Sequence, residues 1–436
     1  MRLQARATGA LTGRVRPASD KSISHRALIL GALAHGRTEI EGLLGADDVL
    51  RTATAVKALG AGVEELGDGK WRVEGNGGFE QPSGAIDCGN SGTGVRLLIG
   101  AAAGHRISAR FDGDKSLRKR PMNRIIAPLT QMGARFDSSD KRLPLTVHGG
   151  GLKGISYRSP VASAQIKSAV LLAGINAEGE TVLIEPELSR DHTERMLAAF
   201  GADIDFVETD AGKSPRVRPS KLTAAPVAVP ADPSSAAFPI AAATLLAKSE
   251  IRLDSVLMNP TRIGFIETLR DMGGVVETVE QRELCGEPIA DLWVRAASLT
   301  GCAPPVERAP SMIDEFPILA VLAAFAEGET RLTGAAELRV KESDRIALMA
   351  EGLKACGVSV EELDDGLVIK GGGAKGVKGG ASVRTAGDHR IAMSFLVLGL
   401  ASKDPVTVDE AEMIATSFPD FVELMRSLGA EINDVT

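Results

Sequence analysis

The stretch KALGAGV, residues 57–63, closes a run of apolar residues at helical spacing with a glycine and then continues toward a strand. A glycine directly after such a run is typical of a helix C-terminus, where the backbone often needs a positive φ. The residues after the glycine alternate as a strand requires, for example in AEIND at 430–434. This signature occurs six times, and its central glycines are 68 to 84 residues apart. They are Gly60, Gly133, Gly201, Gly273, Gly357 and Gly429.

A second signature precedes each of these glycines. It consists of an Ala/Leu-rich run, a turn and a short strand-like segment, as in LAHGRTEIEG at 33–42 and AFAEGETRLTG at 324–334. Each unit of about 70 residues is therefore predicted to contain two helices and several short strands. A single copy could arise by chance, but six at near-constant spacing favour a repeat architecture. Because so small a unit buries its apolar face poorly, we expect the copies to pack on one another.

Composition limits the possible architectures and partners. The 436 residues indicate two or three domains, and a hydrophobic content of 44% is ample for real cores. Aromatic residues make up only 3%, so the cores must be built from Ala, Val, Leu and Ile. The formal net charge of −7 argues against a general nucleic-acid or anionic-membrane surface. Any anionic ligand must then be held by a local cluster of basic residues.

The cysteines and the apolar runs indicate a cytoplasmic protein. Cys88, Cys285, Cys302 and Cys356 have no CxxC spacing, and they are interpreted as free thiols of a reducing compartment, with neither a disulfide framework nor a zinc site. No apolar run reaches about 18 residues, so no membrane span is expected. The basic stretch at 1–17 lacks the apolar core of a signal peptide and is predicted to form strands.

The segment RPASDKSISHR places charged residues at a predicted helix start. Asp20 is positioned to cap the helix, and Lys21 and Arg26 follow in its first turns. Lys21 shares a face with His25, and Ser22 shares one with Arg26. Free backbone N–H groups and two cations at a helix start predict an anion site. A solvated basic helix end is the alternative.

Two further segments suit anions. GNSGTG at 89–94 leads into an apolar helix, and its glycines would let the backbone approach a phosphate or carboxylate closely. It is not a Walker A loop, because no Gly-Lys-Ser/Thr follows, and a plain turn is the other interpretation. DKSLRKRPMNR at 114–124 holds five Lys and Arg residues in an acidic protein. Arginine binds carboxylate and phosphate bidentately, whereas a solvated charge run is equally typical of such clusters.

Polar residues also interrupt helix patterns that are otherwise small or apolar. Ser163, Gln165 and Lys167 lie in a small-residue helix, where they would contact a ligand or cap the helix. Arg190 opens another helix. Asp314 lies within an apolar stretch, where a carboxylate is costly unless it is paired or catalytic. Comparable charged helix starts, interpretable as surface features or as sites, are Lys341, Glu342 and Arg345, and Asp388, His389 and Arg390.

Most of these segments fall at one place in the repeat, the start of the helix that precedes the second signature. Parallel helices in one domain would direct their positive N-terminal ends, with the added Lys and Arg, at one shared region. Two such domains facing one another would make an anion-selective cleft.

The segments DKSISHR, GNSGTG, RPMNR, SAQIK, VKESDR, GDHRIAM and ATSFPD together resemble the 5-enolpyruvylshikimate-3-phosphate synthase family. The resemblance runs from about Pro17 to Pro419, and RPMNR and SAQIK are similar to the class II, often glyphosate-tolerant, subgroup. It implies an α/β fold of two similar domains, each with three βαβαββ repeats arranged as an inside-out α/β barrel.

The resemblance also implies a domain organisation. Residues 1–17 plus 230–436 would form a discontinuous domain, and residues 18–229 an inserted one, with the active site in the cleft between them. The chain would cross between the domains near Val15–Ser19 and Pro226–Asp232.

The activity implied by the resemblance is transfer of the enolpyruvyl group of phosphoenolpyruvate to the 5-hydroxyl of shikimate 3-phosphate, with release of phosphate. The resemblance further implies no metal or organic cofactor, a cytoplasmic monomer, and glyphosate as an inhibitor competing with phosphoenolpyruvate. Neither nucleic acid nor membrane is expected as a partner.

Site residues carry over by position. Asp314 matches the general base at the 5-hydroxyl, Glu342 the acid that protonates and deprotonates the methylene carbon with Lys21 assisting, and His389 neighbours that site. Lys21 would also lie between the two substrates. Contacts to shikimate 3-phosphate are implied for Ser22, Arg26, Ser163, Ala164, Gln165, Arg190, Asp314 and Lys341, and contacts to phosphoenolpyruvate for Asn90, Gly92, Arg120, Arg345 and Arg390.

Three positions depart from the family pattern. Thr416 stands where other members have a lysine that contacts phosphoenolpyruvate, and Glu337 replaces an asparagine that contacts shikimate. Gly92 stands where tolerant class II enzymes carry alanine. We expect Gly92 to leave this chain more sensitive to glyphosate than that subgroup.

Three other functions are weighed against this one. UDP-N-acetylglucosamine enolpyruvyl transferase shares the repeat fold but carries a cysteine in the loop matching 114–124, where this chain has none. An RNA 3′-phosphate cyclase-like protein is opposed by the acidic net charge. A non-catalytic binder of phosphorylated metabolites would not require carboxylates such as Asp314 and Glu342 beside anions.

Overall fold

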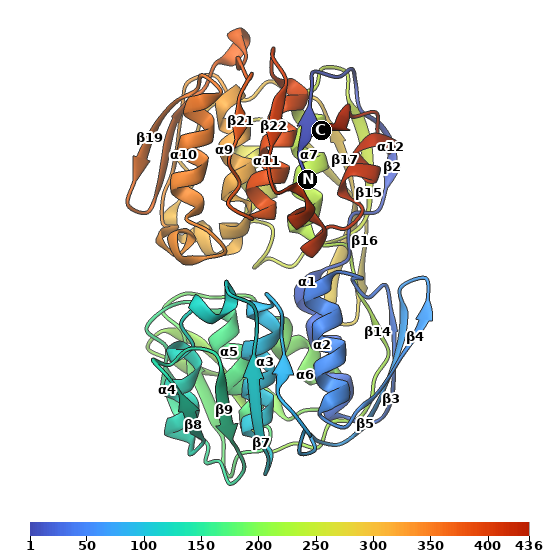
Figure 1. Ribbon diagram of the computed structural model, residues 1–436, viewed down its shortest axis with the longest axis vertical. Coiled ribbons are helices and arrows are strands. Elements are labelled where there is room, and N and C mark those ends of the chain that lie inside the picture. The colour runs from blue at the N-terminus through green and yellow to red at the C-terminus, as the bar shows by residue number, and fades with distance from the viewer. Residues whose placement is uncertain (436) are drawn as a thin grey trace. The chain divides into compact units, whose positions relative to one another are not determined.

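Six small sheets with a common strand plan form the framework of the computed structural model, which describes residues 1–435 (Figure 1). In five of them an edge strand pairs in parallel with a central strand, and two antiparallel pairings follow. In the sixth, an isolated parallel bridge between Thr300 and Glu327 takes the place of the edge strand. This recurrence agrees with the sixfold repeat in the sequence.

The chain divides into two compact units, which we call unit 1 and unit 2. Unit 1 comprises Met1–Ala18, Pro230–Arg282 and Pro288–Thr436, and unit 2 comprises Ser19–Val229 and Glu283–Glu287. Residues 283–287 form the tip of a hairpin whose strands pair within a sheet of unit 1. The sequence had not indicated this extra segment of unit 2, because nothing local in it differs from an ordinary turn.

Unit 2 contains three repeats. The first has α1 (Lys21–Leu33), β3 (His35–Glu41), α2 (Asp47–Ala58), β4 (Gly62–Gly67), β5 (Lys70–Asn76) and the edge strand β14 (Val227–Ala228). The second has β6 (Ile86–Asp87), α3 (Gly92–Ala103), β7 (Ser108–Asp112), η1 (Leu117–Lys119), α4 (Asn123–Met132), β8 (Arg135–Ser138) and β9 (Leu145–His148). The third has β10 (Ser156–Arg158), α5 (Ala164–Gly174), β11 (Thr181–Ile184), α6 (His192–Ala199), β12 (Ile204–Thr209) and β13 (Gly212–Val217).

Unit 1 also contains three repeats. One has β2 (Thr12–Val15), α7 (Pro233–Leu245), β15 (Glu250–Leu257), α8 (Gly264–Asp271), β16 (Val275–Leu284) and β17 (Glu287–Arg295). The next has η2 (Val306–Ser311), η3 (Ile313–Glu315), α9 (Phe316–Phe325), β18 (Glu329–Leu332), η4 (Ala336–Val340), α10 (Arg345–Ala355), β19 (Ser359–Leu363), β20 (Gly366–Lys370) and η5 (Gly373–Lys375). The last has β21 (Ser382–Val383), α11 (His389–Ala401), β22 (Val406–Val408), η6 (Ala411–Thr416), α12 (Phe421–Ser427), β23 (Ile432–Asp434) and β1 (Leu3–Ala5).

Where the chain passes from one unit to the other, its last strand is an edge strand of the unit that it leaves. β2 pairs in parallel with β15 of unit 1, and the chain then enters unit 2 at α1. β14 pairs in parallel with β3 of unit 2, and the chain then enters unit 1 at α7. The strands predicted at the N-terminus are present as β1 and β2 and belong to different sheets of unit 1.

One helix of each repeat lies inside its unit. In unit 2, α3 packs against α1 and α5, and in unit 1, α11 packs against α7 and α9 (Figure 1). The α9 sequence FPILAVLAAF is buried from Phe316 to Ala324, as expected for a helix that is apolar all round. A methyl group at Gly100 of α3 would lie 2.4 Å from the carbonyl oxygen of Ala169 in α5, so glycine permits this close packing. The buried hydrophobic side chains are mainly Ala, Val, Leu and Ile, as composition predicted.

The predicted helix ends are confirmed. All six signature glycines have positive φ, from +81° at Gly201 to +111° at Gly133. Five of the eight functional segments begin inner helices, namely α1, α3, α5, α9 and α11, and the other three precede the outer helices α4, α6 and α10. No helix within residues 1–435 is both long enough and apolar enough to span a membrane.

Candidate active site

The start of α1 places Lys21 beside a carboxylate. The side chain of Asp20 accepts a hydrogen bond from the backbone N–H of Ile23 at 2.8 Å, so it is the predicted N-cap. Lys21 Nζ lies 3.0 Å from Oδ2 of Asp48, which the sequence had not singled out. This ion pair fixes the ammonium group at the N-terminus of the helix, where the helix dipole favours anions.

Arg26 is buried and joins three segments of unit 2. Its guanidinium donates hydrogen bonds to the Ser22 carbonyl at 2.8 Å, to Thr193 Oγ1 at 2.7 Å and to Ser168 Oγ at 2.6 Å. Burial lowers the pKa of Arg26 to about 10, so the group remains a cation at neutral pH. His25 differs, because burial lowers its pKa to about 3 and leaves its ring neutral, with Nδ1 2.8 Å from Thr52 Oγ1.

The Gly-rich loop before α3 lies against Arg120. Ser91 caps the helix by accepting a bond from the Gly94 N–H at 3.1 Å, and Arg120 Nη2 donates to Asn90 Oδ1 at 3.1 Å. A methyl group at Gly92 would lie 2.6 Å from Arg120 Nη1. Glycine at 92 therefore leaves room for this guanidinium.

Arg96, which no local sequence pattern indicates, connects three candidate segments. Its guanidinium donates to the Gly92 carbonyl at 3.1 Å, to Gln165 Oε1 at 2.8 Å and to the Pro121 carbonyl at 3.2 Å. Gln165 Nε2 in turn donates to Thr93 Oγ1 at 3.1 Å. The loops that carry Gly92, Arg120 and Gln165 are thus held together as one group, which with the start of α1 and Arg190 we call the unit 2 cluster.

The remaining predictions for the 114–124 and SAQIK segments have different outcomes. Arg118 forms a two-pronged pair with Asp112, at 2.8 and 2.6 Å, and is half exposed, which fits the solvated-charge interpretation. Ser163 occupies the N-cap position of α5, but its side chain makes no capping bond. Lys167 does not cap the helix either, because it is fully buried among carboxylates.

Unit 1 gathers three carboxylates around one buried arginine, a set we call the unit 1 cluster. Arg345 Nη2 lies 2.7 Å from Glu342 Oε2, Nε lies 2.8 Å from Asp388 Oδ2, and Nη1 lies 3.6 Å from Asp314 Oδ1. Burial by itself would lower the pKa of Arg345, but Asp388, Glu342 and Asp314 together raise it above its ordinary value. Arg345 is thus the buried member of the charged knot before α10, whereas Lys341, Glu342 and Asp344 are partly exposed.

Asp388 organises the start of α11. Burial opposes its ionisation, yet Arg345 and His389 hold its pKa below the ordinary value. It accepts bonds from the backbone N–H of Arg390 at 2.9 Å and from Ser343 Oγ at 2.8 Å. His389 itself is buried beside this carboxylate.

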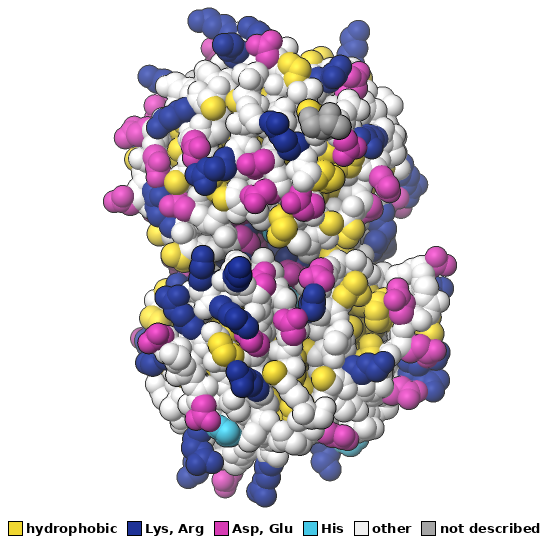
Figure 2. All heavy atoms as spheres, in the orientation of Figure 1, with side chains coloured by type: hydrophobic (Ala, Val, Ile, Leu, Met, Phe, Trp, Pro, Cys, Tyr) yellow, Lys and Arg dark blue, Asp and Glu magenta, His cyan; other side chains and the backbone are white. Residues whose placement is uncertain are grey.

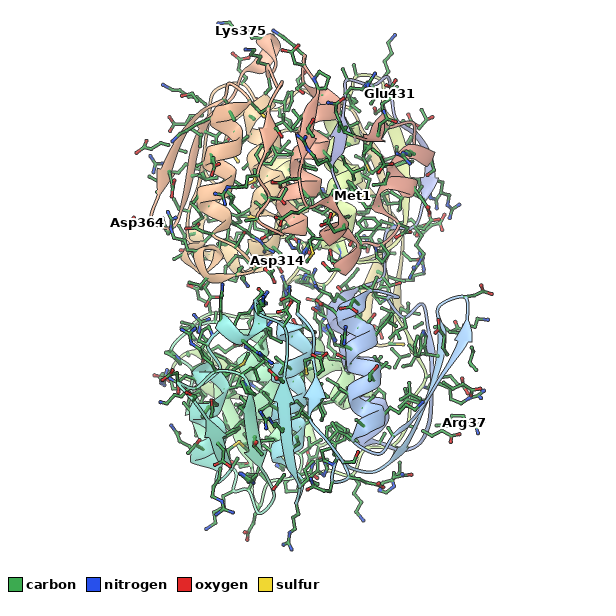
Figure 3. The ribbon with its side chains drawn as sticks, in the orientation of Figure 1. Met1, Arg37, Asp314, Asp364, Lys375 and Glu431 are labelled. Carbon is green, nitrogen blue, oxygen red and sulfur yellow. The ribbon has the colours of Figure 1, made fainter. Side chains whose placement is uncertain are left out.

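Arg390 links α11 to the start of α9, where Asp314 is labelled in Figure 3. Its Nη1 donates to the backbone carbonyl of Asp314 at 3.0 Å and lies 3.6 Å from Glu315 Oε1. Glu315 is buried and also accepts a hydrogen bond from Ser234 Oγ. Asp314 is thus held by its backbone, while its carboxylate stays partly exposed and able to meet a ligand.

Two departures from the family pattern can be located. The hydroxyl of Thr416 donates to the Met413 carbonyl at 2.7 Å within η6, so its proton is already committed. Glu337 lies in η4 and is partly exposed, as is Lys341 directly after that helix.

One group in unit 2 has the composition of a metal site. Asp191, His192 and Glu287 bring their ligand atoms within 4.8 Å of one another. However, Arg195 Nε lies 2.9 Å from Asp191 and 3.7 Å from Glu287, so a guanidinium already neutralises these carboxylates. His192 Nδ1 lies 2.7 Å from Glu287 Oε1, and the group is better described as a buried ion-pair network.

Charge on the visible surface is mixed. Figure 2 shows Lys and Arg side chains interspersed with Asp and Glu over the face of each unit in view. The net charge of −7 still predicts that local clusters of basic residues would hold any anion.

The fold defines the class first: a protein of two α/β units, each built from three repeats. The enolpyruvyl transferase NikO from Streptomyces tendae matches over 100% of this chain and 99% of its own, with a TM-score of 0.79 and 20% identity, which establishes the shared fold. EPSP synthase from Acinetobacter baumannii matches with a TM-score of 0.89 and 42% identity, over 99% of this chain and 100% of that one.

Sequence comparison then identifies the family. The EPSP synthase (3-phosphoshikimate 1-carboxyvinyltransferase) family model matches residues 5–425. The 3-phosphoshikimate 1-carboxyvinyltransferase of Phenylobacterium zucineum is 57% identical over 433 residues, covering 99% of this chain and 95% of the relative. That of Caulobacter vibrioides is 56% identical, covering 97% of each chain. The chain belongs to the EPSP synthase family, and its function is the carboxyvinyl transfer that this family performs in the shikimate pathway.

Proposed function

We propose that the two clusters together bind shikimate 3-phosphate and phosphoenolpyruvate and join them by enolpyruvyl transfer. In unit 2, Ser22, Arg26, Ser163 and Arg190 hold the phosphate of the acceptor. Support comes from their placement at helix starts, where backbone N–H groups and cations suit a phosphate. Ala164, Gln165 and Lys341 complete the acceptor contacts.

Phosphoenolpyruvate is held by arginines of both units. Arg120 binds it beside Asn90 and Gly92, and Arg345 and Arg390 bind its remaining anionic oxygens. Arginine suits this task, because its planar fork matches carboxylate and phosphate bidentately. Lys21 lies between the two substrates and stabilises the charge that develops during transfer.

The chemistry divides between two carboxylates. Asp314 takes the proton of the 5-hydroxyl as its oxygen forms a bond to carbon 2 of phosphoenolpyruvate, and Glu342 donates a proton to carbon 3. Glu342 then takes a proton back from carbon 3 as the bond to phosphate breaks and the phosphate leaves. His389 neighbours this exchange, and Lys21 assists it.

The observation that best supports this assignment is that the carboxylates of Asp314 and Glu342 both lie close to the guanidinium of Arg345. Of these two carboxylates, Glu342 lies closer to the guanidinium, at 2.7 Å. An anionic oxygen of phosphoenolpyruvate would compete for the same cation, and Glu342 would then become easier to protonate. Substrate binding would thus convert a charge partner into the acid that the reaction needs.

Several further properties belong to the same proposal. Glyphosate competes with phosphoenolpyruvate at Arg120 and Gly92, and the enzyme works without a metal or organic cofactor as a cytoplasmic monomer. Free thiols at all four cysteines fit a reducing compartment.

Deuterium incorporation tests the roles of the carboxylates. In D2O, wild-type enzyme should place deuterium in the methylene group of the product, whereas Glu342→Gln should lower both this incorporation and kcat by at least about 100-fold, the usual range for a lost acid–base group. Glu351→Gln, on the exposed surface of the following helix α10, is the matched control. Normal incorporation in Glu342→Gln would remove Glu342 from this role.

A further inference from the structure

Lys167 is a buried cation whose function the reaction does not explain. Its Nζ lies 2.9 Å from Glu185 Oε2, 2.9 Å from Glu194 Oε1 and 3.0 Å from the carbonyl oxygen of Ser189. These three acceptors match the three protons of an ammonium group. The side chain is only 1% exposed, so solvent does not screen these contacts. Such a group costs much to bury and calls for an explanation beyond packing.

The carboxylate of Glu185, the first partner, forms hydrogen bonds with two loops. Its Oε1 accepts hydrogen bonds from the backbone N–H of Ser163 at 3.1 Å and from Ser189 Oγ at 2.6 Å, while Oε2 faces Lys167. Ser163 begins the SAQIK segment, and Ser189 directly precedes Arg190. Two segments assigned to the acceptor phosphate, which are distant from one another along the chain, thus share one carboxylate.

Glu194, the second partner, connects the same centre to Arg26. Thr193, its neighbour on α6, lies 2.7 Å from Ser168 Oγ, and both hydroxyls bond the guanidinium of Arg26. Ser168 directly follows Lys167. The negative charge of Glu194 is among the charges that act on Arg26.

The charges in this buried group balance. Lys167 and Arg26 are two cations, and Glu185 and Glu194 are two carboxylates. Burial would lower the pKa of Lys167, but Glu194 and Glu185 raise it above its ordinary value. Burial raises the pKa of Glu194 in opposition to the effect of Lys167. The lysine therefore stays charged over the whole physiological pH range.

We infer that Lys167 is a positioning residue for recognition of the acceptor's phosphate. It never touches the substrate. Through Glu185, the Ser189 carbonyl and Glu194 it sets the relative positions of Ser163, Arg190 and Arg26. This inference rests on the proposed function, since it takes those three residues as the phosphate contacts.

The inference predicts a selective defect. Lys167→Met should raise the Kd and KM for shikimate 3-phosphate at least about tenfold, because three contacts lose their common support. The KM for phosphoenolpyruvate at saturating acceptor should change less than about twofold. The preference for shikimate 3-phosphate over unphosphorylated shikimate, measured by calorimetric titration of both, should fall with the same factor. General destabilisation would not lower that ratio.

A second variant tests whether misfolding of Lys167→Met explains its defect. Lys167→Met leaves two buried carboxylates without their cation, so Lys167→Met combined with Glu194→Gln removes one of them while Glu185 keeps its bonds to Ser163 and Ser189. This double variant should show the same loss of phosphate preference. Asp291→Asn, which disturbs a buried ion network in unit 1, is the control for lost stability and should leave the Kd for shikimate 3-phosphate unchanged.

The outcomes separate the inference from the function beneath it. Arg190→Ala is measured in parallel. If Arg190→Ala weakens binding of shikimate 3-phosphate and the folded Lys167 variants do not, the positioning role is wrong while the phosphate site stands. If Arg190→Ala also leaves binding unchanged, the phosphate contacts themselves have been misassigned. Loss of phosphate preference in both Lys167 variants, but not in Asp291→Asn, supports the inference.

Discussion

Because Gly92 has no side chain, the guanidinium of Arg120 can lie close to its backbone. A Cβ added at Gly92 would lie 2.6 Å from Arg120 Nη1, which is too short for real atoms, but the obstacle is the far end of a flexible side chain. Alanine would therefore be accommodated by moving the guanidinium, which Asn90 holds at 3.1 Å, and not by moving backbone.

Gly92→Ala tests this reasoning. We expect the inhibition constant of glyphosate to rise at least about tenfold, with a smaller, few-fold rise in the KM for phosphoenolpyruvate, because one displaced bidentate contact is worth roughly 1–3 kcal/mol. Steady-state inhibition at fixed shikimate 3-phosphate measures both. Gly84→Ala, at an exposed position with open space and no left-handed φ, is a control for general effects. An unchanged inhibition constant would contradict the assigned position of Arg120.

Individual residues also show what local sequence can reveal. The cap at Asp20, the glycines after each helix and the free cysteines were all predictable, because each depends on its immediate neighbours. The partners of Arg96 and Lys167 were not predictable, because they lie in other repeats or loops. Gln165, for example, is 69 residues from Arg96. The roles of the site residues came from family resemblance, and spacing alone left each segment open to a plain structural interpretation.

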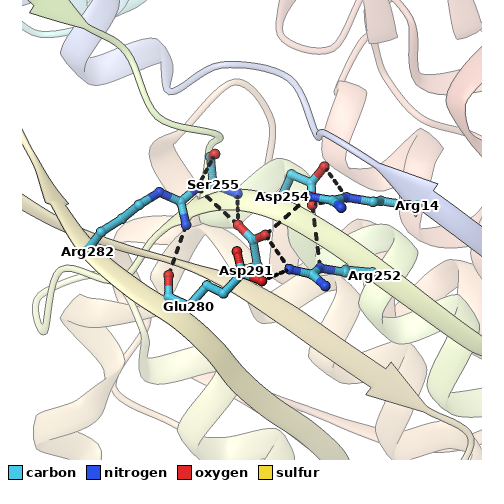
Figure 4. A network of polar contacts seen from close by, with 7 residues as sticks. All are labelled: Arg14, Arg252, Asp254, Ser255, Glu280, Arg282 and Asp291. Atoms are coloured by element: carbon cyan, nitrogen blue, oxygen red, sulfur yellow. Dashed lines mark hydrogen bonds and ion pairs between the residues drawn. The ribbon is translucent and has the colours of Figure 1, made fainter.

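Among the elements, the sheet of β16, β17, β15 and β2 is joined by a polar network (Figure 4). Asp291 of β17 is buried and accepts from Arg252 at 2.9 Å, from Arg282 at 3.1 Å and from the backbone N–H of Ser255 at 2.9 Å. Ser255 lies at a break in the register of β15 and has φ +55°. Arg14 of β2 lies 3.5 Å from the same carboxylate, so one acid connects all four strands.

This network predicts a specific acid response of unit 1. Burial opposes ionisation of Asp291, but its hydrogen bonds from Ser255, Arg252 and Arg282 outweigh burial and lower its pKa to about 2, from an ordinary 3.8. Because the folded pKa is the lower one, ionised Asp291 stabilises the fold above pH 4, and this contribution is lost as pH falls from about 4 to 2. The loss amounts to roughly 2 kcal/mol.

Urea unfolding as a function of pH measures this contribution. Asp291→Asn should lower the free energy of unfolding at pH 7 by about 2 kcal/mol or more and should weaken its dependence on pH between 4 and 2. Asp364→Asn, at an exposed turn, should change neither. A variant with the full wild-type slope would show that Asp291 is not the titrating group.

At the scale of the whole molecule, the repeat is regular, but each compact unit consists of more than one stretch of the chain. Repetition in sequence predicted the six sheets and their helices, because each repeat carries its own periodic pattern. The parallel pairing of β2 with β15 and of β14 with β3, and the membership of residues 283–287 in unit 2, depend on which distant segments pair. No local pattern encodes that pairing.

The hairpin tip offers a test at this scale. Glu287 contacts His192 at 2.7 Å and Arg195 at 3.7 Å, and the Gly286 carbonyl accepts a bond from Arg195 at 2.8 Å. Glu287→Ala should therefore speed amide hydrogen exchange in α6 of unit 2 by about tenfold or more, because His192 and Arg195 lose a buried partner. Glu283→Ala, exposed on the same hairpin, should leave α6 unaffected. Unchanged exchange in Glu287→Ala would mean that the tip does not support unit 2.

Phosphate release in the presence of each acceptor tests the assigned reaction itself. The purified protein is mixed with phosphoenolpyruvate and either shikimate 3-phosphate or UDP-N-acetylglucosamine, and free phosphate is followed over time. We expect phosphate release when shikimate 3-phosphate is the acceptor and none when UDP-N-acetylglucosamine is. Glyphosate should suppress this release. Release with the nucleotide sugar, or no release with either acceptor from folded protein, would contradict the assignment.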